Sequence, residues 1–115
     1  MRFLMYTLGD DSVPLPPPSP ELMEEMGKFI GEATRAGALV ATGAAAPSAE
    51  GITVTRTGDT YTVVDGPYAE AKELIGGWAL IEARDKEEAV EWARRFLAIA
   101  GEGFTRIRQV YGPED

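Results

Sequence analysis

Residues 63–82 read VVDGPYAEAKELIGGWALIE and decide the fold of this chain. An apolar strand is expected to end at Val64, where Asp65-Gly66-Pro67 interrupts it. A short polar segment follows, and Gly76-Gly77 is expected to return the chain to a second apolar strand, Trp78 to Ile81. This stretch therefore predicts a strand, a specialised connection and another strand.

The segments on either side predict further strands. Residues 52–56 and 61–64 alternate β-branched and polar residues around Thr57-Gly58-Asp59-Thr60, which indicates a hairpin. Arg2 to Leu8 has apolar residues at both its odd-numbered and its even-numbered positions, as is typical of a central strand covered on both faces. A strand opening at Leu39-Val40 is expected to end in the small residues 42–47, and the last strand is expected over residues 104–111.

Two helices are predicted from their end signals and their apolar stripes. Ser19 is a good N-cap for the first helix, and Gly37 is expected to end it. Asp85 and Glu88 form a capping-box pattern for the second helix, which is expected to end at Gly101. Residues 11–20, rich in proline, are expected to form a surface loop leading to the first helix, although a proline-rich ligand for another domain is an alternative.

The order of elements is β-α-β, a hairpin, then β-α-β. This order predicts one α+β domain over residues 1–115, a ferredoxin-like two-layer sandwich with a loose tail at 112–115. With helices on one face of the sheet, the other apolar face also needs cover. A second copy of the chain is the simplest source, so we expect a homodimer with sheet-on-sheet packing.

Composition excludes several classes of function. The net charge is −8, which disfavours nucleic acids and anionic membranes as partners. The chain has no Cys and no His, so thiol catalysis, histidine-based triads and the usual zinc sites are excluded. We expect no cofactor and no metal. The longest apolar runs are too short for a membrane span, and a cytoplasmic location is expected.

The motif DGPYAEAKE at residues 65–73, followed by Ile75-Gly76-Gly77, resembles the YCII-related proteins. The similarity is greatest to the branch named for its Asp-Gly-Pro-Phe motif, and it covers nearly the whole chain. It implies a dimeric α+β barrel with a cleft in each protomer. Relatives include a lactone dehalogenase, and barrels of similar shape include isomerases and cofactor-free oxygenases of aromatic compounds. The chain departs from the pattern at Tyr68, which replaces Phe, and at Gly43, where relatives often carry a carboxylate.

Two residues of the motif are candidates for catalysis. Asp65 is expected to cap the turn that follows its strand, and the alternative is that it contacts a ligand directly or moves a proton. Lys72 is either an ammonium that holds or polarises a substrate or a solvated charge paired with a neighbouring Glu.

Four further residues are candidates for ligand binding: Tyr6, Tyr68, Glu70 and Trp78. The two tyrosines would orient a polar group in an apolar pocket, while core packing is the alternative for each. Glu70 is either part of the cleft or a solvated charge, and Trp78 is expected to anchor the core or the dimer.

The sequence thus predicts a protein that binds a small metabolite in a cleft near the Asp-Gly-Pro motif. That metabolite, a lactone or aromatic compound, is expected to be mostly apolar, with an anionic group as one possibility. Cofactor-free chemistry of the lyase, isomerase or hydrolase type would use Asp65 and Lys72. The alternative is a non-catalytic module that senses a ligand or binds a protein in a regulatory circuit.

Overall fold

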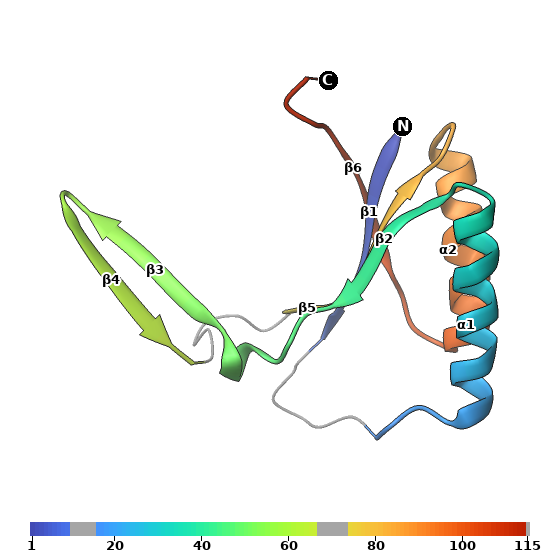
Figure 1. Ribbon diagram of the computed structural model, residues 1–115, viewed down its shortest axis with the longest axis horizontal. Helices are drawn as coiled ribbons and strands as arrows, with labels where there is room; N and C mark the ends of the chain where they lie inside the picture. The colour runs from blue at the N-terminus through green and yellow to red at the C-terminus, as the bar shows by residue number, and fades with distance from the viewer. Residues whose placement is uncertain (10–15, 67–73, 115) are drawn as a thin grey trace.

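The computed structural model describes residues 1–9, 16–66 and 74–114 (Figure 1). Its elements are, in chain order, β1 (Arg2–Gly9), α1 (Pro20–Arg35), β2 (Leu39–Ala44), the 3-10 turn η1 (Ser48–Glu50), β3 (Ile52–Thr57), β4 (Thr60–Asp65), β5 (Leu74–Glu82), α2 (Lys86–Ala100) and β6 (Arg106–Val110).

Four of the strands form one antiparallel sheet in the order β2-β5-β1-β6. Without the hairpin, the chain runs β-α-β-β-α-β, and this spatial order is that of the ferredoxin-like α+β fold. The α+β, ferredoxin-like part of the predicted fold is confirmed, and β1 is a central strand as expected, whereas the dimeric barrel stays a prediction. The hairpin β3–β4 forms a separate two-stranded sheet.

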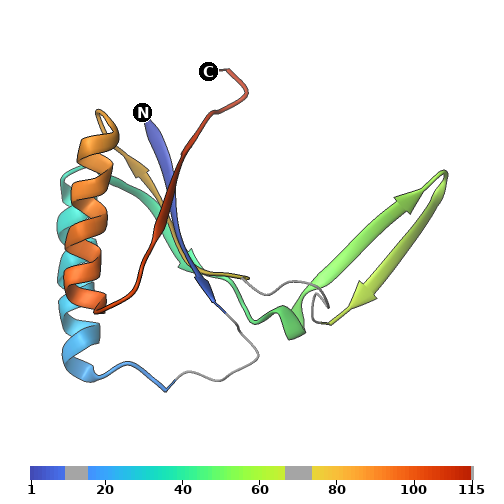
Figure 2. The same cartoon turned by 180° about the vertical axis from the view of Figure 1, so that it is seen from behind.

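Helices α1 and α2 lie side by side on one face of the four-stranded sheet, as Figures 1 and 2 show from opposite sides. The core lies between them and the sheet. It contains Phe3, Met5, Ile81, Ala83, Ala89 and Ala93. Phe3 and Met5 are paired with Ile81 and Ala79 across β1 and β5, so alternate residues of these strands face the helices.

The helix ends follow the local signals in the sequence. The Ser19 hydroxyl accepts a hydrogen bond from the amide of Leu22 (3.1 Å), and Gly37 adopts φ +76° just beyond α1. The Asp85 carboxylate accepts a bond from the amide of Glu88 (2.8 Å) at the start of α2. The Glu88 carboxylate accepts a hydrogen bond from the amide of Arg84 (3.3 Å). In a standard capping box this bond comes from the amide of the N-cap residue, so here it comes from the residue before the N-cap.

Two strands, β5 and β6, differ in their bounds from the predictions. β5 begins at Leu74, so Gly76-Gly77 lies inside the strand and does not precede it. The Thr7 side chain gives a reason for Gly76, because a Cβ there would lie 3.3 Å from the Thr7 hydroxyl oxygen. β2 ends at Ala44, within the small residues 42–47 where its end was expected. β6 spans only Arg106–Val110, within the expected 104–111.

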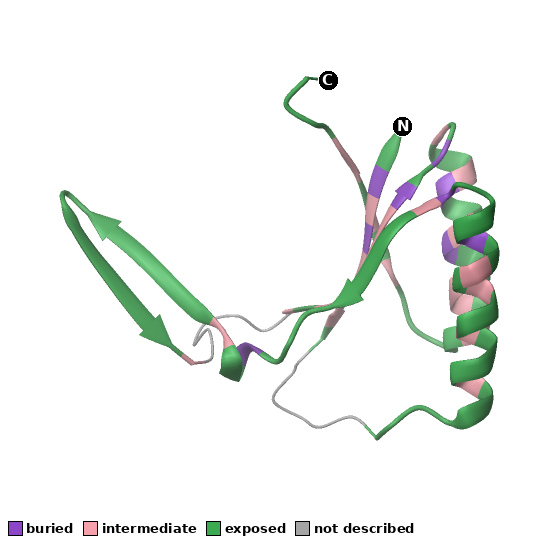
Figure 3. Ribbon diagram, viewed as in Figure 1, coloured by how far each residue is buried: buried purple, intermediate pink, exposed green. Residues whose placement is uncertain are grey.

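The hairpin stands away from the sheet on the side opposite the helices (Figures 1 and 2). Its strands are joined at Gly58, which has φ +60°, and the amide of Gly66 donates to the carbonyl of Gly51 (3.0 Å) at its base. Every residue of β3 and β4 is exposed, as the continuous green in Figure 3 shows. We call residues 52–65 the arm.

The face of the sheet that points away from the helices is the open face. Strand alternation assigns to it Leu4, Tyr6, Trp78, Leu80 and Val110, together with Arg106 and Arg108 on β6. A second copy of the chain covering this face stays a prediction.

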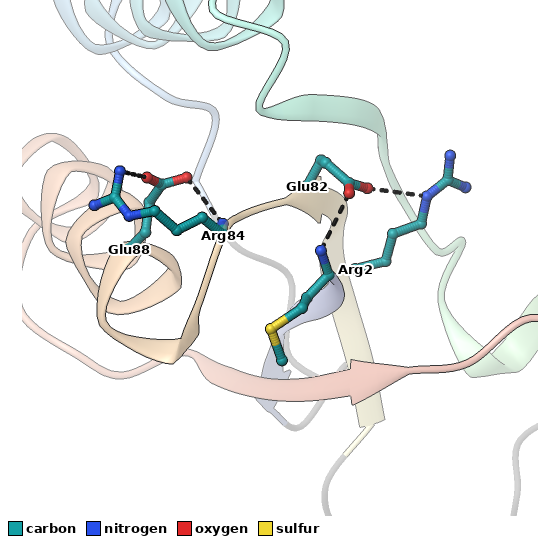
Figure 4. A network of polar contacts seen from close by, with 5 residues as sticks. Arg2, Glu82, Arg84 and Glu88 are labelled. Carbon is teal, nitrogen blue, oxygen red and sulfur yellow. Dashed lines mark hydrogen bonds and ion pairs between the residues drawn. The ribbon is translucent and has the colours of Figure 1, made fainter. Parts of the chain in front are cut away.

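At one end of the sheet a polar cluster joins β1 to β5 (Figure 4). The Glu82 carboxylate accepts hydrogen bonds from the Met1 amine and from Nε of Arg2, both at 3.2 Å. The hydrogen bond from the amine, followed by the bond from Arg2, holds the pKa of Glu82 below its ordinary 4.5. Among residues 1–9, 16–66 and 74–114, no helix combines the length and apolar character that a membrane crossing requires.

Candidate functional site

A cavity of about 210 Å³ lies between the two helices and the sheet. Five aromatic residues contribute to its lining: Tyr6, Phe29, Trp78, Trp92 and Phe96. The remaining lining residues are Met5, Thr7, Met26, Ile30, Ala33, Ala38, Leu39, Thr42, Gly43, Gly77, Ala79, Ile81 and Thr105. None of these residues is charged, so the cavity is an apolar site within the described part of the chain.

The helix side of the cavity is held in place by an aromatic pair. The rings of Phe29 on α1 and Trp92 on α2 have centroids 6.0 Å apart and are tilted by 48°. The Arg95 guanidinium lies over both rings, 5.2 Å from the centroid of Phe29 and 4.7 Å from that of Trp92. Arg95 also forms an ion pair with Glu32 on α1. The guanidinium therefore lies on the outer side of the two rings, and the rings line the cavity.

Three threonine hydroxyls at the sheet side are used by the backbone. Thr42 donates to the carbonyl of Trp78 (2.8 Å), and Thr105 donates to the carbonyl of Tyr6 (3.0 Å). The Thr7 hydroxyl accepts from the amide of Gly77 (2.9 Å) and lies 3.4 Å from its carbonyl. These bonds use the hydroxyl protons of Thr42 and Thr105, so these two side chains have no free donor for a ligand.

Tyr6 and Trp78 are neighbours, as paired residues of β1 and β5. Both border the cavity. Because Met5 and Ala79 face the helices, alternation directs the rings of Tyr6 and Trp78 to the open face. The structure thus brings two of the predicted ligand-binding residues together on the sheet side of the cavity. Their rings lie on the opposite face of the sheet, away from the helices.

Gly43 on β2 is opposite Trp78 and makes room for it. A Cβ at Gly43 would lie 3.1 Å from Cζ2 of the indole ring and 3.3 Å from its Nε1. The resemblance puts a carboxylate at this position in relatives. In this chain the Trp78 ring occupies the space that such a side chain would need.

The predicted catalytic and polar residues are not gathered at the cavity. Asp65 is the last residue of β4, is exposed, and is not among the lining residues. Tyr68, Glu70 and Lys72 lie outside the described residues. Within the part of the chain that is described, no three acidic residues lie close enough together to hold a metal ion.

Several lining residues were not singled out by the sequence. Met26, Phe29 and Phe96 belong to the predicted helical stripes, which were assigned to the core. Trp92 lies beside such a stripe on α2. The sequence carries no signal that separates these residues from an ordinary packed core, because their spacing is the same in both cases.

Comparison with protein families gives one match. The model described as "YCII-related domain" matches residues 1–111, which include all the elements of the fold, the cavity and the arm. A search of curated proteins returns no match. The family match does not distinguish branches, so assignment to the Asp-Gly-Pro-Phe branch stays a prediction.

Proposed function

The chain belongs to the YCII-related family, and from this premise we propose that it binds a small, mostly apolar molecule between its helices and its sheet. The observation that carries the proposal is the cavity, whose described lining is entirely uncharged. Ligand sites in proteins are typically concave and apolar with few polar groups, and this cavity has that character.

The volume of the cavity limits the size of the ligand. An apolar cavity of about 150 Å³ accommodates benzene. At about 210 Å³, this one suits a molecule slightly larger than benzene, such as a substituted aromatic ring or a short lactone. It is smaller than the roughly 300–1000 Å³ typical of sites for drug-sized ligands.

The lining also favours neutral ligands over ions. Placing an isolated carboxylate in an apolar cavity without a partner charge costs several kcal/mol or more. For the cavity as described, we therefore favour a neutral ligand over the anionic one that the sequence left open. An anion would depend on Lys72, and Lys72→Ala tests this dependence directly.

Binding is measured with the protein's own fluorescence. Both tryptophans of the chain border the cavity, and Trp78→Phe leaves Trp92 as a single reporter next to Phe29. We expect neutral aromatic compounds and lactones to change Trp92 emission saturably and to raise the melting temperature. At a hundred times Kd, a ligand adds about 2.7 kcal/mol to the stability.

A cavity-filling variant supplies the control. Ala33 is buried and lines the cavity from α1, so Ala33→Leu is expected to weaken binding at least tenfold while the protein stays folded. Ala98→Leu makes the same change at an exposed position of α2 and is expected to leave binding unchanged. Equal affinities of the two variants for the same ligand would contradict a site in this cavity.

Whether the ligand is converted depends on the motif. In the catalytic form of the proposal, Asp65 moves a proton and Lys72 holds or polarises the substrate, while Tyr68 and Glu70 orient it. Tyr6 is left out of this role, because its ring is directed to the open face. Asp65→Asn and Lys72→Ala would then abolish turnover while ligand binding by Trp92 emission persists. The alternative is a sensing module, for which the wild type binds ligand without turnover. The uncharged lining favours the sensing module, since the described cavity supplies no carboxylate or amine.

A further inference from the structure

The arm carries an apolar face that no other described element covers. Ile52, Val54, Tyr61 and Val63 share this face, because Val54 is paired with Val63 and Tyr61 with Arg56 across the hairpin. Asp65, which is paired with Ile52, lies on the same face at the base of the arm. Their exposed fractions are 58%, 64%, 65% and 63%. The Arg56 guanidinium lies 5.8 Å from the centre of the Tyr61 ring and extends the face toward the turn.

The other face of the arm has a different character. It carries Thr53, Thr55, Thr57, Thr60 and Thr62, with Val64 as its one large apolar residue. The arm is thus amphipathic, which is the pattern of a hairpin that packs one face on another surface. A two-stranded hairpin by itself is marginally stable in water, so the arm needs such a surface.

The solvent-accessible surface of the chain is larger than is usual for a folded monomer of this mass. A folded chain of 12.4 kDa is expected to expose about 6100 Å², and this one exposes 8635 Å². Its radius of gyration is 16.7 Å, against about 13 Å expected for a compact chain of this length. The excess of about 2500 Å² is as large as the area that each partner contributes to an obligate homodimer.

A second uncovered apolar surface lies on the same chain. The open face of the sheet presents Leu4, Leu80 and Val110 with the Tyr6 and Trp78 pair, and no described helix lies on it. The arm projects on this side but stands clear of the chain's own sheet (Figures 1 and 2). One chain therefore leaves two apolar surfaces open that it does not bring together.

We propose that the arm docks on a second copy of this chain. In a two-fold dimer each copy lends its arm to the other, so that both arms and both open faces are buried by one symmetric, self-complementary interface. This extends the sheet-on-sheet dimer expected from the sequence by assigning the arm as part of the contact. It does not rest on the ligand-binding function, since the cavity lies on the opposite side of the sheet.

The first experiment compares the two faces of the arm. Val54→Thr/Val63→Thr makes the apolar face polar with nearly the same shape, and Thr55→Val/Thr62→Val makes the reverse change at the neighbouring pair on the other face. Sedimentation equilibrium of the full chain is expected to show a dimer for the wild type. The dimer Kd should rise about a hundredfold or more in the first variant and change less than about threefold in the second.

A second experiment keeps the apolar face intact. A photoreactive benzoylphenylalanine in place of Tyr61 is expected to give covalent dimers on irradiation, and the same group in place of Thr62, on the other face, should give few. Cross-linking only within one chain would overturn the proposal, because the arm would then fold back on its own sheet. A monomeric wild type at 100-micromolar concentration, or equal Kd values for the two double variants, would also overturn it.

Discussion

Because Gly43 has no side chain, the indole ring of Trp78 can occupy the space above β2 at this position. The indole of Trp78 lies over the glycine, at distances that no Cβ accommodates without a shift. The sequence identified both residues as unusual, Gly43 because relatives often carry a carboxylate there and Trp78 because it follows two glycines. Their contact was not predictable, because it joins strands separated by more than thirty residues and depends on the register of β2 with β5.

Gly43→Ala is expected to lower the stability by about 1 kcal/mol, because the new Cβ displaces the Trp78 ring from a well-packed position. In a Trp78→Phe background the smaller ring should remove most of this cost. Urea denaturation of the four proteins in the cycle measures the coupling, which we expect to be about 1 kcal/mol. Equal costs of Gly43→Ala in both backgrounds would contradict the contact.

Glu82 gives a residue-scale prediction for pH. Its pKa is lowered mainly by the hydrogen bond from the Met1 amine, so the ionised form is favoured in the folded protein. This contribution to stability is therefore fully present above the unfolded pKa, about 4.5, and is lost as the pH falls through the lower folded pKa.

Glu82→Gln should accordingly reduce the melting temperature at pH 7, and the difference from the wild type should shrink below about pH 4. Glu114→Gln changes the net charge equally at an exposed position near the C-terminus and serves as the control. A difference that is constant from pH 7 to pH 3 would show that the Glu82 carboxylate is not stabilised by its ion pairs.

At the scale of elements, the helix starts were predictable and the start of β5 was not. Helix ends depend on capping residues that are near in sequence, such as Ser19 and Asp85, so the pattern predicts them correctly. The start of β5 depends on Thr7, which lies on another strand and binds the backbone of Gly77. Two adjacent glycines resemble a break until that partner is known.

The caps predict a change in stability that is specific to one element. Asp85→Ala removes the acceptor for the amide of Glu88 and is expected to cost about 1 kcal/mol, or about 4 °C in melting temperature. Asp85→Asn keeps an acceptor at the same position and should cost only a few tenths of that. Thermal unfolding followed by circular dichroism measures both. A loss as large for Asn as for Ala would assign the effect to charge and not to capping.

At the scale of the whole molecule, the sequence predicted a hairpin but not its place. Alternation in residues 52–65 is the same whether the hairpin joins the main sheet or stands apart as an arm, because the pattern reports only that one face is apolar. The cavity was not predictable from the sequence either, because Phe29 and Phe96, which line it, have the spacing of ordinary core residues. The aromatic residues Tyr6 and Trp78 were identified, but the face on which their rings lie required the strand register.

The net charge of the molecule predicts how its self-association responds to salt. Two copies with a charge of −8 each repel one another, while the proposed contact between arm and open face is mainly apolar. Raising the salt concentration from 10 mM to 150 mM shortens the screening length from about 30 Å to about 8 Å and weakens this repulsion. The dimer Kd is therefore expected to fall severalfold, which sedimentation equilibrium at the two concentrations measures. A rise in Kd with salt would instead indicate an interface held by ion pairs, such as Arg108 of the open face with acidic residues of the second copy.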